Sequence, residues 1–368
     1  MPPTHCPLLR RLPLLSLCAL LMLPAACKKA EEAAPAAPET APDPAAPAAT
    51  PAEPKAETEA PMVAKWPSGK RLQVHTETVS EIEFAMAATA VTSKTESHIT
   101  QDIAFAALKE RVGGGNEIEV QVTSMTMENR SAGKVVASFD PKSDPKKDPR
   151  YSIAASLRKL LGAKLKYLTT AEGKIDKVEG LVPLLTRLNT AASPQALILV
   201  RTLINDDAVK SWDTLHFGLP DQPVKPGSAW EVKRDIPFGP TKFTLTGTNT
   251  FTAWEQRNNK KVAHLVFQGT MTTKEGMSSG NVTLAEGSTV TGKSWYDPEL
   301  GVIEETESLS QFTVNVMQTS GQTTTSKYQA KVTSKLAGSN DSGTGTPAVA
   351  ETAPIPAAPP AAKAATPK

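Results

Sequence analysis

The feature that most constrains this fold is a two-residue alternation of apolar and polar side chains, which recurs between Met62 and Leu336. Side chains of a strand point alternately to opposite faces, so this period predicts strands with one buried and one solvated face. The clearest case, residues 327–336, sets Tyr328, Ala330, Val332, Ser334 and Leu336 on one face and Lys327, Gln329, Lys331, Thr333 and Lys335 on the other. The pattern predicts a long, meandering antiparallel sheet.

The same alternation recurs in other segments, and threonine is frequent at their polar positions, which suits a pleated surface. Residues that favour tight turns stand between these segments. The apolar sets are Leu72 and Val74; Ile82, Phe84 and Met86; Ile118, Val120 and Val122; Phe243, Leu245 and Phe251; and Phe312, Val314 and Val316. The turn candidates are Gly113–Asn116, Asn258–Asn259 and Pro226–Gly227, the last of which precedes the strand of Trp230.

Helical patterns interrupt the strands at two places. In residues 151–164, the apolar side chains Ile153, Leu157, Leu160 and Leu161 fall on one helix face. Ser193 and Pro194 supply a cap and a first-turn proline for a second helix, which reaches Ile204. This helix is apolar nearly all round and must be enclosed, either as plain core or as a lid that lines a pocket for an acyl chain. The second alternative assigns ligand contacts to Leu197, Leu199, Val200 and Leu203.

The N-terminus has the pattern of an export signal. Arg10 and Arg11 precede an apolar run from Leu12 to Ala26, which is shorter than the roughly 20 residues that span a bilayer. We therefore expect residues 1–26 to be a signal peptide that is removed from the mature protein.

The run ends in Leu23-Pro24-Ala25-Ala26-Cys27, which resembles a bacterial lipobox, although Pro24 stands where that motif usually has leucine. The resemblance implies that Cys27 becomes the first mature residue and carries a lipid, a permanent anchor when several acyl chains are attached. The alternative is ordinary secretion. Cys6, Cys18 and Cys27 are the three cysteines, so a mature Cys27 has no partner for a disulfide, which favours lipidation. Lys28 and Lys29 follow Cys27 at the position where a retention signal would have Asp. We therefore expect the outer membrane of a bacterial envelope.

Composition divides the mature chain into three parts. Residues 27–61 are rich in Ala, Pro and Glu, and residues 337–368 in Ala, Pro, Gly, Ser and Thr. Neither segment has enough apolar surface to offset the entropy of folding. We expect a disordered tether from the lipidated cysteine, a β-rich domain over 62–336 and a disordered tail.

Charge and motif content exclude several classes of function. With 40 Lys+Arg against 38 Asp+Glu, the chain lacks the basic field of a nucleic-acid-binding protein. The histidines are scattered without metal-ligand spacing, and the phosphate-loop, dinucleotide and zinc-protease motifs are absent. We expect neither a metal nor a cofactor. The repeated Asp140-Pro141, Asp144-Pro145 and Asp148-Pro149 lack the spacing of a calcium loop and predict a solvated loop.

One short motif points to an enzyme. Ser156 and Lys159 form an S-x-x-K on a predicted helix, where Lys159 would help to deprotonate Ser156. Ser279-Gly280-Asn281 resembles the S-x-N element of penicillin-recognising acyltransferases. The chain lacks the K-[ST]-G element of those enzymes. The S-x-x-K pattern also occurs by chance, since Ser131-Ala132-Gly133-Lys134 matches it in a predicted loop. We therefore expect no enzymatic activity.

Three longer stretches carry a family resemblance: residues 171–180 (AEGKIDKVEG), 217–230 (FGLPDQPVKPGSAW) and 292–301 (GKSWYDPELG). Their order resembles a bacterial family of secreted lipoproteins with a domain of unknown function, and the likeness implies no activity. The layout also looks like the half-barrel carriers that shuttle lipoproteins and lipids across the periplasm, an analogy of architecture.

The expected fold is α+β and mainly β: a long curved antiparallel sheet, like a half-barrel, with two or three helices packed on one side. The expected function is that of an envelope protein, anchored to the membrane through Cys27, whose core binds an apolar ligand such as a lipid, or an envelope protein partner. A structural subunit of an envelope complex is the alternative, followed by an acyl-transfer enzyme that uses Ser156 and Lys159.

Overall fold

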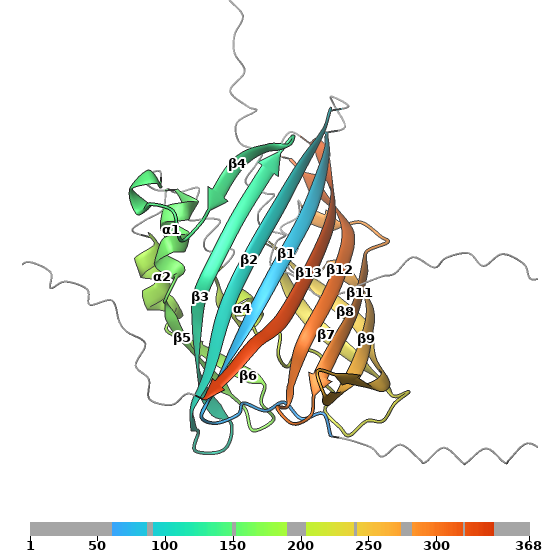
Figure 1. Ribbon diagram of the computed structural model, residues 1–368. Coiled ribbons are helices and arrows are strands. Elements are labelled where there is room, and N and C mark those ends of the chain that lie inside the picture. Colours follow the sequence, from blue (N-terminus) through green and yellow to red (C-terminus); the bar gives the residue numbers. More distant parts are fainter. Residues whose placement is uncertain are drawn as a thin grey trace, which may run out of the picture.

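The computed structural model describes residues 61–86, 91–148, 152–189, 204–238, 241–273, 282–318 and 321–341 of the 368. Their 13 strands form one antiparallel sheet in the order β6-β5-β3-β2-β1-β13-β12-β11-β9-β8-β7, with β4 paired to β3 and β10 to β12 (Figure 1). The strands are β1 (Lys70–Met86), β2 (Val91–Glu110), β3 (Asn116–Ser131), β4 (Lys134–Phe139), β5 (Lys164–Thr169), β6 (Ile175–Glu179), β7 (Ala229–Phe238), β8 (Thr241–Arg257), β9 (Lys260–Thr273), β10 (Val282–Leu284), β11 (Thr289–Asp297), β12 (Val302–Met317) and β13 (Thr323–Asp341).

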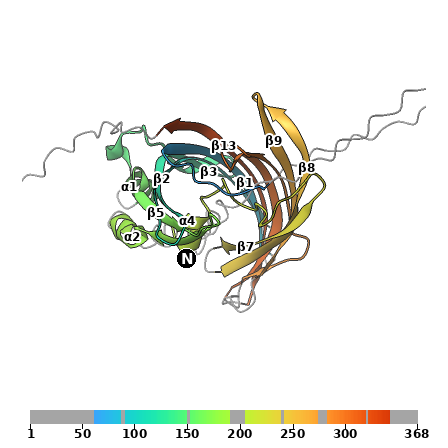
Figure 2. The same cartoon turned by 90° about the horizontal axis from the view of Figure 1, so that it is seen from below.

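The sheet curls around an interior but does not close, because β6 and β7 stand at its two ends (Figure 2). The helices α1 (Ile153–Leu160), α2 (Leu181–Asn189) and α4 (Asp206–Lys210) lie along the open side. A 3₁₀ turn at Pro145–Lys147 precedes α1 in the chain. The short helix α4 contacts both β6 and β7. The predicted fold class is therefore confirmed: the protein is mainly β, with one large open antiparallel sheet and a few helices. None of the described helices has the length and apolar character needed to cross a membrane.

The alternation of β13 is confirmed. Tyr328, Ala330, Val332 and Ser334 are buried, whereas the intervening lysines are exposed. This strand pairs with β1 on one side and β12 on the other, so it joins the first and last parts of the domain. The strand continues to Asp341 and pairs there with Lys70. The folded domain therefore extends five residues past Leu336, where the composition predicted the tail to begin.

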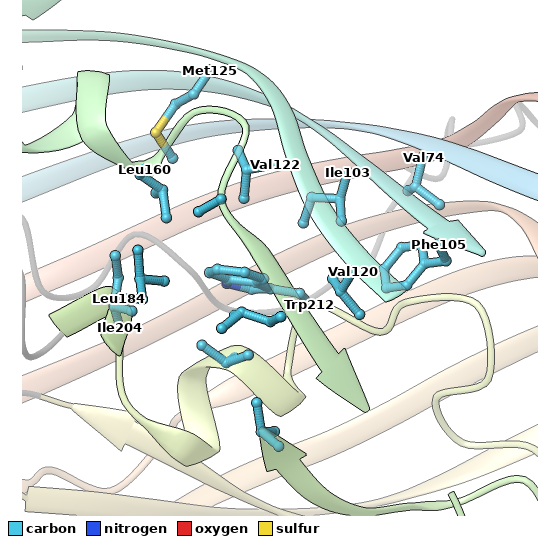
Figure 3. Packing of buried hydrophobic residues seen from close by; sticks show 14 of the residues in the cluster. Val74, Ile103, Phe105, Val120, Val122, Met125, Leu160, Leu184, Ile204 and Trp212 are labelled. Carbon is cyan, nitrogen blue, oxygen red and sulfur yellow. The ribbon is translucent and has the colours of Figure 1, made fainter. Parts of the chain in front are cut away.

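The helices pack against the sheet through their apolar faces (Figure 3). The hydroxyl of Ser152 caps α1 by accepting a hydrogen bond from the backbone N–H of Ala155 at 3.2 Å. The predicted face of α1 is confirmed, because Leu157 and Leu160 are buried in the same cluster as Val120 of β3. Trp212, which follows α4, lies among the side chains of this cluster.

The helix α2 was not predicted from the sequence. Leu181, Leu184, Leu185 and Leu188 nevertheless repeat at helical spacing, and Leu184 and Leu188 are buried. Most of the apolar helix predicted from Ser193 lies outside the described residues, and Ile204, at its predicted end, is buried.

The predicted turns are present. Gly113–Gly115 joins β2 to β3 and Asn258–Asn259 joins β8 to β9, with all five residues at positive φ. Gly115 is required for packing as well as for backbone conformation, because a Cβ at this position would lie 2.1 Å from the carbonyl oxygen of Thr169.

The segment before β1 is part of the folded domain. The Tyr296 hydroxyl donates to the carbonyl oxygen of Val63 at 3.0 Å, and the Trp66 indole N–H donates to that of Gly173 at 3.3 Å. The backbone N–H of Lys65 donates to the carbonyl oxygen of Gly301 at 3.0 Å. These bonds fix the point at which the preceding chain leaves the domain.

Candidate ligand-binding cavity

A cavity of about 80 Å³, which opens to solvent, lies on the inner face of the sheet; we call it the inner cavity. Its wall comes from the central strands β1, β2, β12 and β13, from β7, β8, β9 and β11, and from the segment after α4. The lining residues are Thr76, Thr78, Ile99, Gln101, Ile103, Ser211, Trp212, Thr214, Phe217, Arg234, Asn249, Phe267, Gly292, Lys293, Ser294, Ile303, Thr306, Val332 and Ser334.

The hollow exists because the inward positions of the central strands carry small side chains. We call this set the hydroxyl band: Thr76, Thr78 and Ser80 of β1, Ser334 of β13, and Thr306, Ser308 and Ser310 of β12. Larger inward side chains stand on either side of the band, with Val74 on one side and Ile82 and Tyr328 on the other. Threonine was expected mainly at the polar positions of the strands, and the hydroxyl band shows that it also occupies buried inward positions.

Several buried polar atoms of this region have no hydrogen-bond partner among the described residues. They are the amide nitrogen of Gln101, the indole nitrogen of Trp212 and the hydroxyls of Ser80, Ser308 and Ser310. Gln101 is 5% exposed and Trp212 is 7% exposed, and both line the inner cavity. A buried polar group without a partner costs about 1–3 kcal/mol, so such groups commonly mark places where water or a ligand supplies the partner.

Arg234 adds a positive charge to the wall. It occupies an inward position of β7 between Val232 and Ile236, which are both buried and apolar. Its guanidinium lies over the ring of Phe217, 4.8 Å from the ring centre. Burial lowers the pKa of Arg234 from its ordinary value, and the charge of Asp213 opposes this effect. An arginine remains protonated despite such a shift.

The loop that carries Phe217 is held by two hydrogen bonds to one carbonyl oxygen. The indole N–H of Trp230 and the amide of Asn249 each donate to the carbonyl oxygen of Gly218 at 2.8 Å. Both donors belong to the inward face at the β7–β8 end of the sheet. The sheet thereby positions Phe217 against Arg234.

Phe217 and Arg234 also line a second hollow, the outer groove, which lies between the two ends of the sheet. It has a volume of about 870 Å³ and is bounded by residues 172–175, before and at the start of β6, and by residues 231–235 of β7. Met62–Ala64 also lines it. Phe217 and Arg234 therefore separate the inner cavity from a groove that faces solvent.

The structure also locates the residues of the predicted S-x-x-K motif. Ser156 is buried, and its hydroxyl donates to the carbonyl oxygen of Ser152 at 3.4 Å within α1. The ammonium of Lys159 donates to the carbonyl oxygen of Arg187 at 3.5 Å. The second element, Ser279-Gly280-Asn281, lies outside the described residues. Ser131 and Lys134 flank the turn between β3 and β4.

The aspartate-rich loop is tied to α1. The Arg158 guanidinium donates to Asp148 at 2.7 Å, to the carbonyl oxygen of Pro141 at 3.0 Å and to the Ser143 hydroxyl at 3.0 Å. The hydrogen bond that Arg158 donates to the Asp148 carboxylate raises the pKa of Arg158 above its ordinary value. Within the described ranges, no group of three or more His, Cys, Asp or Glu side chains is placed to hold a metal ion.

Cys27, Leu197, Leu199, Val200 and Leu203, the residues predicted to carry the lipid or to contact a ligand, lie outside the described residues. None of the residues that line the inner cavity was predicted from the sequence to contact a ligand. Arg234 had a readable signal, because it is the charged exception in the inward series Trp230, Val232, Ile236 and Phe238.

Comparison with known proteins identifies a family. The family described as "Family of unknown function (DUF6263)" matches residues 114–303. No curated protein matches the chain.

Solved structures give only distant similarities in fold. The chain resembles lipovitellin, in a structure of its lipid–protein interactions, with 12% identity and a TM-score of 0.40; the match covers 75% of this chain and 26% of lipovitellin. It also resembles a protein described as exported, with a YmcC-like fold, from Bacteroides fragilis, with 12% identity, a TM-score of 0.27 and coverage of 73% and 97%. A DUF1329 family protein from Desulfovibrio piger matches with 6% identity, a TM-score of 0.13 and coverage of 69% and 83%.

Proposed function

The chain belongs to DUF6263, a family of unknown function, and we propose that it is a non-enzymatic binding protein whose inner cavity takes an apolar ligand of the lipid class. We further propose that a lipid on Cys27 holds it in the bacterial cell envelope, at the outer membrane. Both proposals concern one arrangement, in which a tethered domain binds a ligand drawn from the membrane beside it.

The observation that carries the ligand proposal is the hydroxyl band beneath the inner cavity. Thr78 and Thr306 stand where the ends of the same sheet carry Ile82 and Val314. A folded core normally fills such inward positions to close-packed density. Small side chains here leave room for a guest, and the apolar walls formed by Ile99, Ile103 and Phe267 suit an acyl chain.

The position of the tether supports the membrane part of the proposal. Met62–Ala64 lines the outer groove, so the preceding chain, which would run back to Cys27, leaves the domain beside the opening between β6 and β7. The N-terminal sequence supports export and lipidation through the apolar run and the small residues before Cys27. A ligand that leaves a membrane would then meet the groove first and Phe217 and Arg234 next.

Native mass spectrometry tests the ligand proposal. The full chain with Cys27→Ser would be expressed with its signal sequence in a diderm bacterium and purified from the periplasm without detergent. We expect a near-stoichiometric adduct that solvent extraction identifies as an acyl lipid, because the cavity favours burial of apolar surface by about 25 cal/mol per Å². A bare protein, or one that co-purifies only with a stoichiometric protein partner, would overturn the proposal in favour of a structural role.

A further inference from the structure

We propose that the ligand of the inner cavity carries one anionic group, a carboxylate or a phosphate, and that the guanidinium of Arg234 binds it. This inference rests on the proposed function, because it assigns the head group of the amphiphile whose chain would occupy the cavity. The ligand class is therefore a single-headed anionic lipid, such as a fatty acid or an alkyl phosphate.

The first argument is that the hydrogen-bonding capacity of Arg234 is unused. The face of its guanidinium contacts Phe217, but an arginine has five N–H donors at its edge. Among the described residues, none accepts a hydrogen bond from this guanidinium or forms an ion pair with it. A charge held among apolar side chains is unfavourable unless a counter-charge pairs with it, and Asp213, whose charge acts on Arg234, is hydrogen-bonded to His216 instead. A planar fork of donors fits the two oxygens of a carboxylate or phosphate.

The second argument is the charge of the wall. Arg234 is the cation that faces the inner cavity from β7, whereas no aspartate or glutamate is among its described lining residues. The unpartnered nitrogens of Gln101 and Trp212 lie in the same wall. A cavity with one inward cation, free donors and no acid among its described lining residues selects a ligand rich in hydrogen-bond acceptors. Arg234 lines both the inner cavity and the outer groove. The head group of a ligand would therefore stop beside Arg234 once the acyl chain has entered the inner cavity.

A different role for Arg234 makes a different prediction. β7 is an end strand, and an inward charge on such a strand hinders pairing with a second sheet. If Arg234 served only that purpose, its replacement would cause self-association and leave ligand selectivity unchanged. The discriminating readout is therefore selectivity between matched anionic and neutral ligands, together with the oligomeric state.

The experiment compares palmitate and hexadecyl phosphate with monopalmitoylglycerol and inorganic phosphate, by isothermal titration calorimetry on the delipidated Cys27→Ser chain. We expect both anionic amphiphiles to bind at least about 10-fold more tightly than monopalmitoylglycerol, because a hydrogen bond to a charged group contributes about 1.5–3 kcal/mol. Arg234→Gln should weaken the anionic amphiphiles about 10- to 100-fold and leave monopalmitoylglycerol unchanged. The matched control, Lys331→Gln, removes a charge from the exposed face of β13 and should change none of the affinities.

The remaining outcomes separate the two proposals. Equal binding of charged and neutral amphiphiles, with no effect of Arg234→Gln, would overturn the head-group assignment and leave the cavity function standing. Binding of inorganic phosphate as tight as that of hexadecyl phosphate, or self-association of Arg234→Gln with unchanged selectivity, would also overturn it. Failure of every amphiphile to bind would overturn the proposed function itself. If Arg234→Gln does not fold, the preference of the unsubstituted cavity for palmitate over monopalmitoylglycerol decides the question.

Discussion

Thr78→Phe should strongly weaken ligand binding and leave the domain folded. Thr78 lies at an inward position of β1 in the hydroxyl band and lines the inner cavity. A phenyl ring there displaces a stretch of acyl chain of about four methylenes, each of which contributes about 0.8 kcal/mol when buried. The expected loss is about 3 kcal/mol, or roughly 100-fold in Kd for palmitate, measured by calorimetry on the delipidated chain.

The neighbouring residue supplies the control. Val79 points to the opposite face of β1 and is 48% exposed, so Val79→Phe adds the same ring outside the cavity. It should bind palmitate with the affinity of the unsubstituted protein. Equal affinity in both variants would show that the ligand does not occupy the space beside Thr78. Loss of cooperative unfolding in Thr78→Phe would instead show that this space is packed core, contrary to the account.

Phe243→Ala should have the largest effect on stability. Phe243 is fully buried in β8. Its ring stacks on Phe238 with centres 4.8 Å apart and meets the edge of Phe312 at 6.2 Å. Removal of a buried phenyl group leaves a cavity and typically costs about 3–5 kcal/mol in the free energy of unfolding. Urea denaturation followed by circular dichroism measures this difference.

Val136→Ala provides the comparison for Phe243→Ala. Val136 lies in β4 and is 56% exposed, so its replacement should change the free energy of unfolding by less than about 0.5 kcal/mol. A loss below about 1 kcal/mol for Phe243→Ala would contradict the packing described for this end of the sheet. Together with Thr78→Phe, the pair distinguishes the packed end of the sheet from its hollow middle.

The strands were predictable because their signal is local. In β13 the order of apolar and charged side chains determines which face is buried, and each residue carries that information itself. The pairing of β13 with β1 was not predictable, since it joins strands at opposite ends of the domain and depends on contacts that no local pattern encodes. The helix α2 had a readable pattern in Leu181, Leu184 and Leu188 that was overlooked.

The cavity was harder to predict for a physical reason. A serine or threonine can lie on either the buried or the solvated face of an alternating strand. Ser308 and Thr306 therefore look like ordinary surface residues in the sequence. Whether a small inward side chain leaves a hollow depends on what the opposite wall contributes at that height, which is a property of the assembled sheet. Arg234 is the exception, because a charge in the series of Trp230, Val232 and Ile236 breaks the apolar face of its own strand.

The most direct test of the account is photolabelling with a palmitate that carries a diazirine at the middle of its chain, followed by peptide mapping of the Cys27→Ser protein. Because the chain should lie against the inner face, we expect labels on Thr78, Phe267 and Val332, which line the inner cavity, and their loss with an excess of unlabelled palmitate. Labels confined to the convex face, at Val79 or Lys331, would contradict the claim that the interior of this open sheet is a lipid-binding site.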